Sequence, residues 1–117
     1  MRKLTNGLVH SMGADVDLHI DVGYPSVMNN EKVTTAAMKK ASEYMGAENV
    51  SETELRMGAE DFGYYAQKIP ACFYRLGTMN KAKGITAGVH TPVFNIDESA
   101  IEIGMGMMAW LGISIQP

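Results

Sequence analysis

The chain has 117 residues, of which 46% are hydrophobic, so it is long enough for about one domain with its own core. The net charge of −3 arises from scattered charged residues, without the basic stripe that a nucleic-acid backbone requires. No apolar run approaches membrane-spanning length, and the amino terminus lacks the apolar core of a signal peptide. We therefore expect neither a nucleic-acid nor a membrane partner.

The single cysteine, Cys72, indicates the redox environment. It cannot form an internal disulfide, and the chain lacks the cysteine pairs of zinc sites. Cys72 lies in an apolar run and is interpreted as a small buried hydrophobic residue. These features favour a reducing, cytoplasmic setting.

The chain begins with a predicted helix and strand. Apolar residues recur at helical spacing over residues 1–12, and Gly13 is expected to end this helix. Over residues 15–22 apolar side chains alternate with aspartates and a histidine, which predicts a strand with one buried face.

The second predicted helix has the clearest boundaries. Either Asn29 or Asn30 could cap its start, and Gly46 is expected to close it. One face is apolar and consists of Val33, Ala37, Ala41, Tyr44 and Met45.

The middle of the chain predicts two more strands. Residues 54–57 form a plausible short strand, and residues 62–68 a short helix that ends before a proline. Residues 71–76 are rich in aromatics and typical of a central strand. A turn-rich stretch, residues 77–95, follows and carries His90.

The chain ends with a predicted apolar helix that either Asp97 or Ser99 could cap. Gly104 and Gly106 are each unfavourable in a helix by about 1 kcal/mol relative to alanine, so we expect them to allow close packing against a sheet. Alternating helices and strands predict an α/β layer architecture.

Three carboxylates and an imidazole line one side of the first predicted strand: Asp15, Asp17, His19 and Asp21. Oxygen donors at this spacing could bind calcium or magnesium. The same alternation is what a half-exposed strand shows, so we interpret this row as a solvent-facing side.

Glu60 and Asp61 lie at a predicted junction between a strand and a helix. Carboxylates at a helix start often cap free backbone amides. Loops after strand ends in α/β sheets also gather ligands, so a site role for the pair stays open.

His90 lies in a loop, where its position cannot be explained by amphipathic packing. Imidazole is a common metal ligand, and Pro92 stiffens the backbone beyond it. Hydrogen bonding within the loop is the other interpretation. A metal site also needs three or four ligands, and the chain has only three histidines.

Three ordered segments carry a family resemblance: MGAEDFGYY at residues 57–65, IPACFYRLG at residues 69–77 and HTPVFNIDE at residues 90–98. Together they resemble the carboxy-terminal part of the metal-dependent amidohydrolases that cleave N-acyl amino acids. Hippurate hydrolases, auxin-conjugate hydrolases, aminoacylases and related metallopeptidases belong to this group. The resemblance covers nearly the whole chain.

The resemblance implies a fold in two parts. Residues 1–22 resemble the last helix and strand of a lid or dimerisation domain, through which the complete enzyme could form a homodimer. Residues 23–117 resemble the carboxy-terminal part of a zinc-peptidase-like α/β sandwich. That catalytic domain holds two divalent metal ions, usually zinc, with manganese as an alternative.

The resemblance also implies roles for three residues. His90 matches the last metal ligand, and Glu60 and Asp61 match a pair near the metal and the substrate. The other ligands and the general base of the family have no counterpart in these 117 residues. Hydrolysis of an N-acyl amino acid or small peptide by a metal-activated water would therefore need a larger protein, and we expect the isolated chain to be inactive. The alternative is a stand-alone, non-catalytic α/β module for interaction or assembly.

Overall fold

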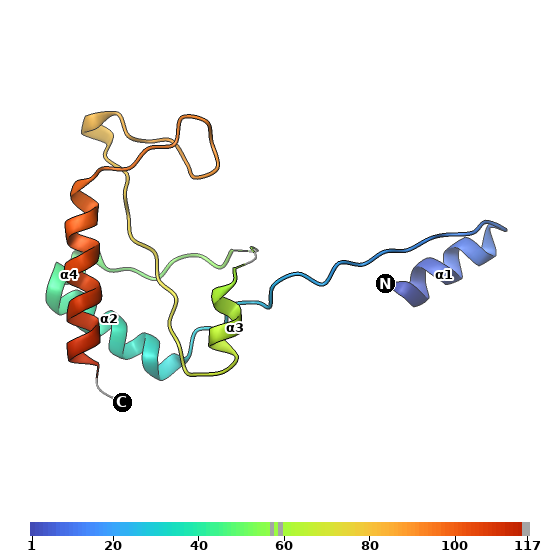
Figure 1. Cartoon of the computed structure of the whole chain (residues 1–117), viewed down its shortest axis with the longest axis horizontal. Helices are drawn as coiled ribbons and strands as arrows, with labels where there is room; N and C mark the ends of the chain where they lie inside the picture. The colour runs from blue at the N-terminus through green and yellow to red at the C-terminus, as the bar shows by residue number, and fades with distance from the viewer. Residues whose placement is uncertain (57, 59, 116–117) are drawn as a thin grey trace.

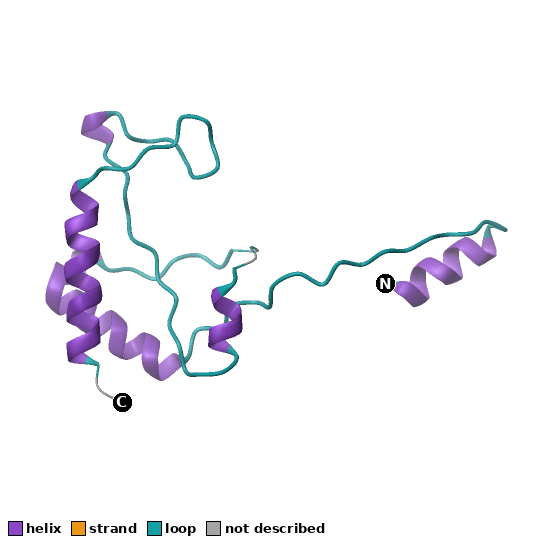
Figure 2. Cartoon of the chain, in the orientation of Figure 1, coloured by secondary structure: helices purple, strands orange, loops and turns teal. Residues whose placement is uncertain are grey.

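The fold is known from a computed structural model, which describes residues 1–56, 58 and 60–115. Figure 1 shows helices joined by long extended segments, and Figure 2 shows the same chain coloured by secondary structure. The helical elements, in chain order, are α1 Arg2–Ser11, α2 Glu31–Met45, η1 Ala47–Asn49, α3 Phe62–Ala66, η2 Lys81–Lys83 and α4 Ser99–Ser114.

The predicted helices are confirmed, although α3 is shorter than expected and Glu98, without a side-chain cap bond, holds the cap position of α4 that was predicted for Asp97 or Ser99. The expected signals are seen at α1 and α2. Gly13 follows α1 in the left-handed conformation, with φ of 65°. The side chain of Asn30 caps α2 by accepting a hydrogen bond from the Val33 amide at 3.2 Å. Gly46 also adopts a positive φ, of 89°, directly after α2. Local sequence therefore determines where these helices begin and end.

Helices α2 and α4 pack against each other and form the core (Figure 1). Small side chains are buried on both, namely Ala37, Ala41 and Ala100, together with Met107. Trp110 on α4 donates a hydrogen bond from its indole Nε1 to the carbonyl of Lys40 at 2.9 Å. The Lys40 ammonium also lies 5.9 Å from the centre of the Trp110 ring, within the range of a cation–π interaction.

Two glycines of α4 lie where a side chain would meet a neighbour. A Cβ on Gly106 would overlap the Tyr44 hydroxyl of α2, and one on Gly104 would lie 2.8 Å from the Leu76 side chain. The prediction of close packing at these glycines is therefore correct. The partners are a helix and a single extended segment, whereas a sheet had been expected.

Asn29 attaches the extended segment 71–76 to the start of α2. The side-chain nitrogen Nδ2 of Asn29 donates to the Phe73 carbonyl at 2.9 Å, and the side-chain oxygen Oδ1 accepts from the backbone nitrogen of Phe73 at 2.8 Å. The backbone amide of Asn30 also donates a hydrogen bond to the Ala71 carbonyl at 2.8 Å. One side chain thus pairs with both backbone groups of Phe73, as a neighbouring strand would.

The predicted strands are not observed, so the α/β sandwich is not confirmed. Within the described ranges the only β pairing is an isolated antiparallel bridge between Asn80 and Ile85. Residues 15–22 and 71–76 run extended without a paired strand. Residues 54–56 form no strand either, and Met57 lies outside the described residues. The physical reason is that a strand requires partner backbone groups, which no neighbouring segment of the described chain supplies.

The chain leaves much apolar surface uncovered. Its radius of gyration is 20.6 Å, whereas about 13 Å is typical of a compact domain of roughly this length. Val22 and Leu55 are 95% and 96% exposed, and α1 protrudes from the helical body (Figure 1). None of the helices in the described part is long and apolar enough to span a membrane. The division at residues 22 and 23 stays a prediction.

Replacing Gly106 by alanine tests the packing of α2 on α4. Alanine favours a helix by about 1 kcal/mol, but at position 106 the Tyr44 ring must first move aside, so Gly106→Ala should gain less stability than the same change at an open site. Gly112→Ala is the matched control in the same helix, because nothing lies within 4 Å of the place that its Cβ would take, and it should raise stability. Urea unfolding followed by far-UV circular dichroism measures both. Equal stabilisation by the two substitutions would contradict the close contact.

Candidate functional site

Aromatic side chains hold helix α3 in place. This packing determines the position of Glu60 and Asp61, which directly precede the helix. The rings of Phe62 and Phe73 lie 5.3 Å apart, and those of Tyr24 and Tyr64 meet edge to face at 6.0 Å. Gly63 is buried, and a Cβ there would lie 2.5 Å from the carbonyl oxygen of Pro25. Helix α3 therefore lies against the segment that leads into α2.

Glu60 and Asp61 precede α3 without the side-chain cap that the sequence suggested. The Glu60 carboxylate accepts a hydrogen bond from the neighbouring Asp61 amide at 3.1 Å. Asp61 occupies the cap position of α3, but its side chain accepts no capping hydrogen bond. Glu60 is half-buried and Asp61 exposed, so both carboxylates can reach a ligand that approaches α3.

His90 is exposed and lies near the middle of the loop that joins η2 to α4. Its backbone has a φ of 66°, and among the described residues it is the one non-glycine residue with a positive φ. Such a conformation is uncommon outside glycine, although histidine is among the residues enriched there. Pro92 follows within a turn that a hydrogen bond from the Phe94 amide to the Thr91 carbonyl closes at 3.1 Å. Hydrogen bonding of the imidazole within the loop, the alternative role predicted for His90, is not observed among the described residues.

The structure does not bring the predicted site residues together. Figure 1 shows the loop before α4 and the start of α3 in different parts of the molecule. The described residues contain no group of three or more histidine, cysteine, aspartate or glutamate side chains that could hold a metal ion. The His90 imidazole suits zinc or manganese as a single donor, but a metal centre needs further donors.

The row of Asp15, Asp17, His19 and Asp21 is exposed, as predicted, apart from any strand. The alternating apolar residues, such as Val16 and Val22, are exposed as well, so the predicted buried side of this segment is not observed. His19 and Asp21 pair at 2.7 Å, with side chains that are 83% and 90% exposed. A pair so exposed contributes little to stability. The described residues of this row form no metal site.

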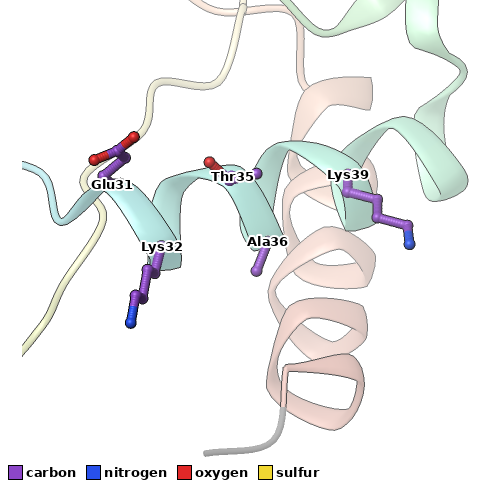
Figure 3. Close-up of a pocket in the computed structure, with 5 residues that line it drawn as sticks. All are labelled: Glu31, Lys32, Thr35, Ala36 and Lys39. Carbon is purple, nitrogen blue, oxygen red and sulfur yellow. The ribbon is translucent and has the colours of Figure 1, made fainter.

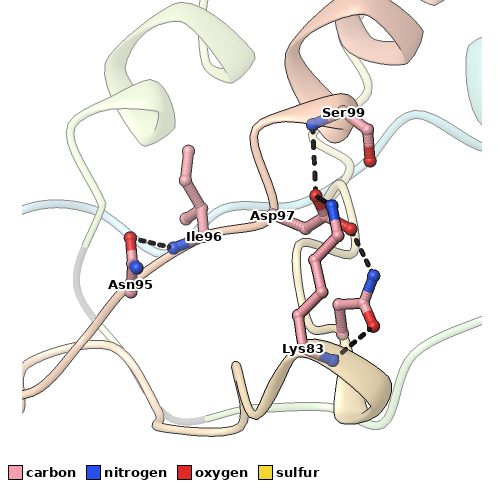
Figure 4. Close-up of polar contacts among 6 residues, drawn as sticks. Lys83, Asn95, Ile96, Asp97 and Ser99 are labelled. Atoms are coloured by element: carbon pink, nitrogen blue, oxygen red, sulfur yellow. Dashed lines mark hydrogen bonds and ion pairs between the residues drawn. The ribbon is translucent and has the colours of Figure 1, made fainter.

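Asp97 is a buried charged residue that the sequence had suggested only as a helix cap. Its carboxylate accepts hydrogen bonds from the Lys83 ammonium at 2.7 Å and from the Asn80 amide at 2.5 Å. It also accepts a hydrogen bond from the backbone amide of Ser99, the first residue of α4, at 3.3 Å (Figure 4). We call Asn80, Lys83 and Asp97 the Asp97 clasp.

The clasp explains the acidity of Asp97. The hydrogen bond from Lys83, followed by the one from Asn80, holds the pKa of the Asp97 carboxyl well below its ordinary value. Sequence periodicity could not reveal this cluster, because its members are 14 and 17 residues apart. The one available signal was the aspartate just before the last helix.

Two surface hollows accompany these elements. One, of about 480 Å³, lies along α2 and is lined by Glu31, Lys32, Thr35, Ala36 and Lys39 (Figure 3). It contains none of the predicted site residues. The other, of about 340 Å³, lies beside the clasp and includes Lys83, Asn95 and Asp97 in its lining. The second hollow therefore adjoins the loop that carries His90.

The lowered pKa of Asp97 predicts a specific acid sensitivity. The ionised carboxylate stabilises the fold fully above the ordinary aspartate pKa of about 4, and this contribution is lost as the pH falls toward the lower pKa of the folded state. Asp97→Asn should therefore lose stability at pH 6 and show a smaller further loss between pH 4 and pH 2. Urea unfolding across this range measures the difference. Parallel stability curves for the two proteins would contradict this role of the carboxylate.

Comparison with known proteins gives these residues a context. The sequence matches Peptidase family M20/M25/M40 over residues 4–111. Thermostable carboxypeptidase 1 of Saccharolobus solfataricus is 35% identical over 115 residues, which are 97% of this chain and 28% of that protein. IAA-amino acid hydrolase ILR1-like 6 of Arabidopsis thaliana is 34% identical over 86 residues, 74% of this chain and 18% of that protein.

A third relative is the putative amidohydrolase YhaA of Bacillus subtilis, 28% identical over 95% of this chain and 28% of that protein. The chain thus spans between 18% and 28% of the length of these relatives. No solved structure matches the sequence. The family match covers most of the chain and includes all three predicted site residues, so the chain belongs to the peptidase family M20/M25/M40, a family of hydrolases.

Proposed function

We propose that the chain is the carboxy-terminal portion of a metal-dependent amidohydrolase that cleaves the amide bond of N-acyl amino acids or small peptides. The observation that carries this proposal is the family match over residues 4–111, which contains an exposed His90 in a left-handed backbone conformation. Two of the relatives are named as a carboxypeptidase and as an IAA-amino acid hydrolase. Both names describe hydrolysis, and cleavage of an amide bond would account for both.

His90 is proposed as one metal ligand. An exposed imidazole is a good donor for zinc. A divalent metal, when bound, polarises the substrate carbonyl and lowers the pKa of water. The described residues do not supply the remaining donors, so those donors and the general base would come from the rest of a longer protein.

Glu60 and Asp61 are proposed to contact the substrate or to support the metal ligands. Among the described residues, neither carboxylate caps α3, which leaves both able to bind a ligand. Within the described part of the chain, the Glu60 carboxylate accepts a hydrogen bond only from the adjacent Asp61 amide. Its side chain can therefore reorient without breaking a long-range interaction.

The remaining proposals concern the whole protein. Residues 1–22, which comprise α1 and an unpaired extended segment, would belong to a lid or dimerisation domain that mediates a homodimer. The exposed apolar residues of this part, such as Leu4 and Leu8, are compatible with further packing. A cytoplasmic location is proposed from the lone Cys72.

The first test measures hydrolysis by the 117-residue chain alone. We expect no turnover of N-acyl amino acids with added zinc or manganese, because a single histidine neither holds a metal firmly nor supplies a base. The longer protein that contains the chain should hydrolyse such substrates in a metal-dependent way. Turnover by the chain alone would refute the need for further residues, whereas inactivity of both proteins would favour the non-catalytic module.

The second test substitutes His90 in the longer protein. His90→Ala should lower zinc affinity by at least about tenfold, since even residues that only support a ligand contribute that much. Equilibrium dialysis with metal analysis measures the loss. His10→Ala is the matched control, because His10 lies on the exposed surface of α1 and should leave metal affinity unchanged. Unchanged zinc content in His90→Ala would remove this residue from the ligand set.

A further inference from the structure

The Asp97 clasp connects both ends of the loop that carries His90. Before the loop, Asn80 and Ile85 exchange two backbone hydrogen bonds, each of 2.9 Å. After the loop, the Asp97 amide donates to the Thr78 carbonyl at 2.9 Å. The Asp97 carboxylate then binds Lys83 and Asn80 across the gap between the two ends (Figure 4). The two ends are therefore held together by one backbone hydrogen bond and by one buried carboxylate.

Residues 86–95 between these ends have only local hydrogen bonds. The Thr91 hydroxyl donates to the Gly88 carbonyl at 2.9 Å, and the Phe94 amide donates to the Thr91 carbonyl. The side-chain oxygen of Asn95 accepts a hydrogen bond from the backbone amide of the next residue, Ile96, at 2.9 Å. Within the described chain, no hydrogen bond joins residues 86–95 to another element. The position of this loop is consequently determined at its ends.

From this geometry we propose that Asp97, acting through Lys83 and Asn80, is the positioning residue for the loop 86–95 and therefore for His90. The carboxylate is well suited to this role, because it is only 11% exposed and accepts bonds from both sides of the loop. Its importance for hydrolysis rests on the proposed function, in which His90 binds the metal. Its effect on loop position does not depend on that function.

A simpler role for Asp97 would be to cap α4. The Asp97 carboxylate accepts the amide of Ser99, the first residue of α4, at 3.3 Å, although the cap position itself is held by Glu98. The two shorter bonds, from Lys83 and Asn80, reach a different segment and are not needed by α4. Lys83→Met separates the two roles, since it removes one bond across the loop and leaves the Ser99 contact in place. Lys83 is 59% exposed, so the substitution should be tolerated.

Amide hydrogen exchange followed by NMR tests the clasp on the 117-residue chain without metal. In Lys83→Met the amides of Asn80, Ile85 and Asp97 should exchange about tenfold faster, as expected for loss of one charge-assisted hydrogen bond. The first amides of α4 should keep their rates. Lys81→Met is the matched control, because Lys81 is an exposed residue of the same helical turn and lies outside the clasp.

A distance measurement tests the position of the loop itself. Spin labels on Val93→Cys and Lys39→Cys, in a Cys72→Ser background, connect the exposed loop with the exposed side of α2. The distribution of label distances should broaden in Lys83→Met and broaden further in Asp97→Asn, with helix content unchanged. Glu98→Gln serves as the matched control for Asp97, since it changes an adjacent exposed carboxylate.

Two results would overturn the proposal. One is unchanged exchange at Asn80, Ile85 and Asp97 in both clasp variants. The other is an unchanged distance distribution in Asp97→Asn while only the α4 amides exchange faster, which would reduce Asp97 to a helix cap. Neither measurement uses metal or substrate, so a failed hydrolysis assay would refute the proposed function and leave this inference standing.

Discussion

The packing of α2 against α4 supports the rest of the structure. Small residues let the two helices approach, and the Tyr44 hydroxyl lies where a Cβ on Gly106 would be. Segment 71–76 is attached to this pair at both ends, through Asn29 at the start of α2 and through Leu76 against Gly104. The clasp then fixes the following loop beside the start of α4. The position of His90 thus depends on a chain of contacts that begins between two helices.

The helices could be predicted from the sequence because their signals are local. Asn30 and Gly46 lie at the ends of α2, where their backbone preferences act directly. Residues 15–22 and 71–76 have strand-like patterns, but pairing depends on partners that no local pattern reveals. The same limit applies to the bond between Asn29 and Phe73, which are 44 residues apart. The roles expected for His90 and Glu60 came from motif resemblance, whereas Asn80 and Lys83 of the clasp lie outside the three motif segments.

The exposed apolar surface and the family match both favour the proposal that this chain packs against further residues of a longer protein. Helix α4 is apolar around its circumference, yet one side packs on α2 while Met105 and Met108 are exposed. Helices of this composition are normally buried on all sides. Since the chain spans at most 28% of the carboxypeptidase, the IAA-amino acid hydrolase and YhaA, these surfaces and the unpaired segments are well suited to contact further residues of a longer hydrolase. On the proposed function, the same residues would complete a metal site around His90.

The central claim is that His90 is one ligand of a metal site completed from outside these 117 residues. Anomalous diffraction at the zinc absorption edge, from crystals of the longer protein, tests it most directly. We predict a peak about 2.0–2.1 Å from a ring nitrogen of His90, with the other ligands from outside this chain. A metal bound elsewhere, with the His90 imidazole in solvent, would contradict the claim.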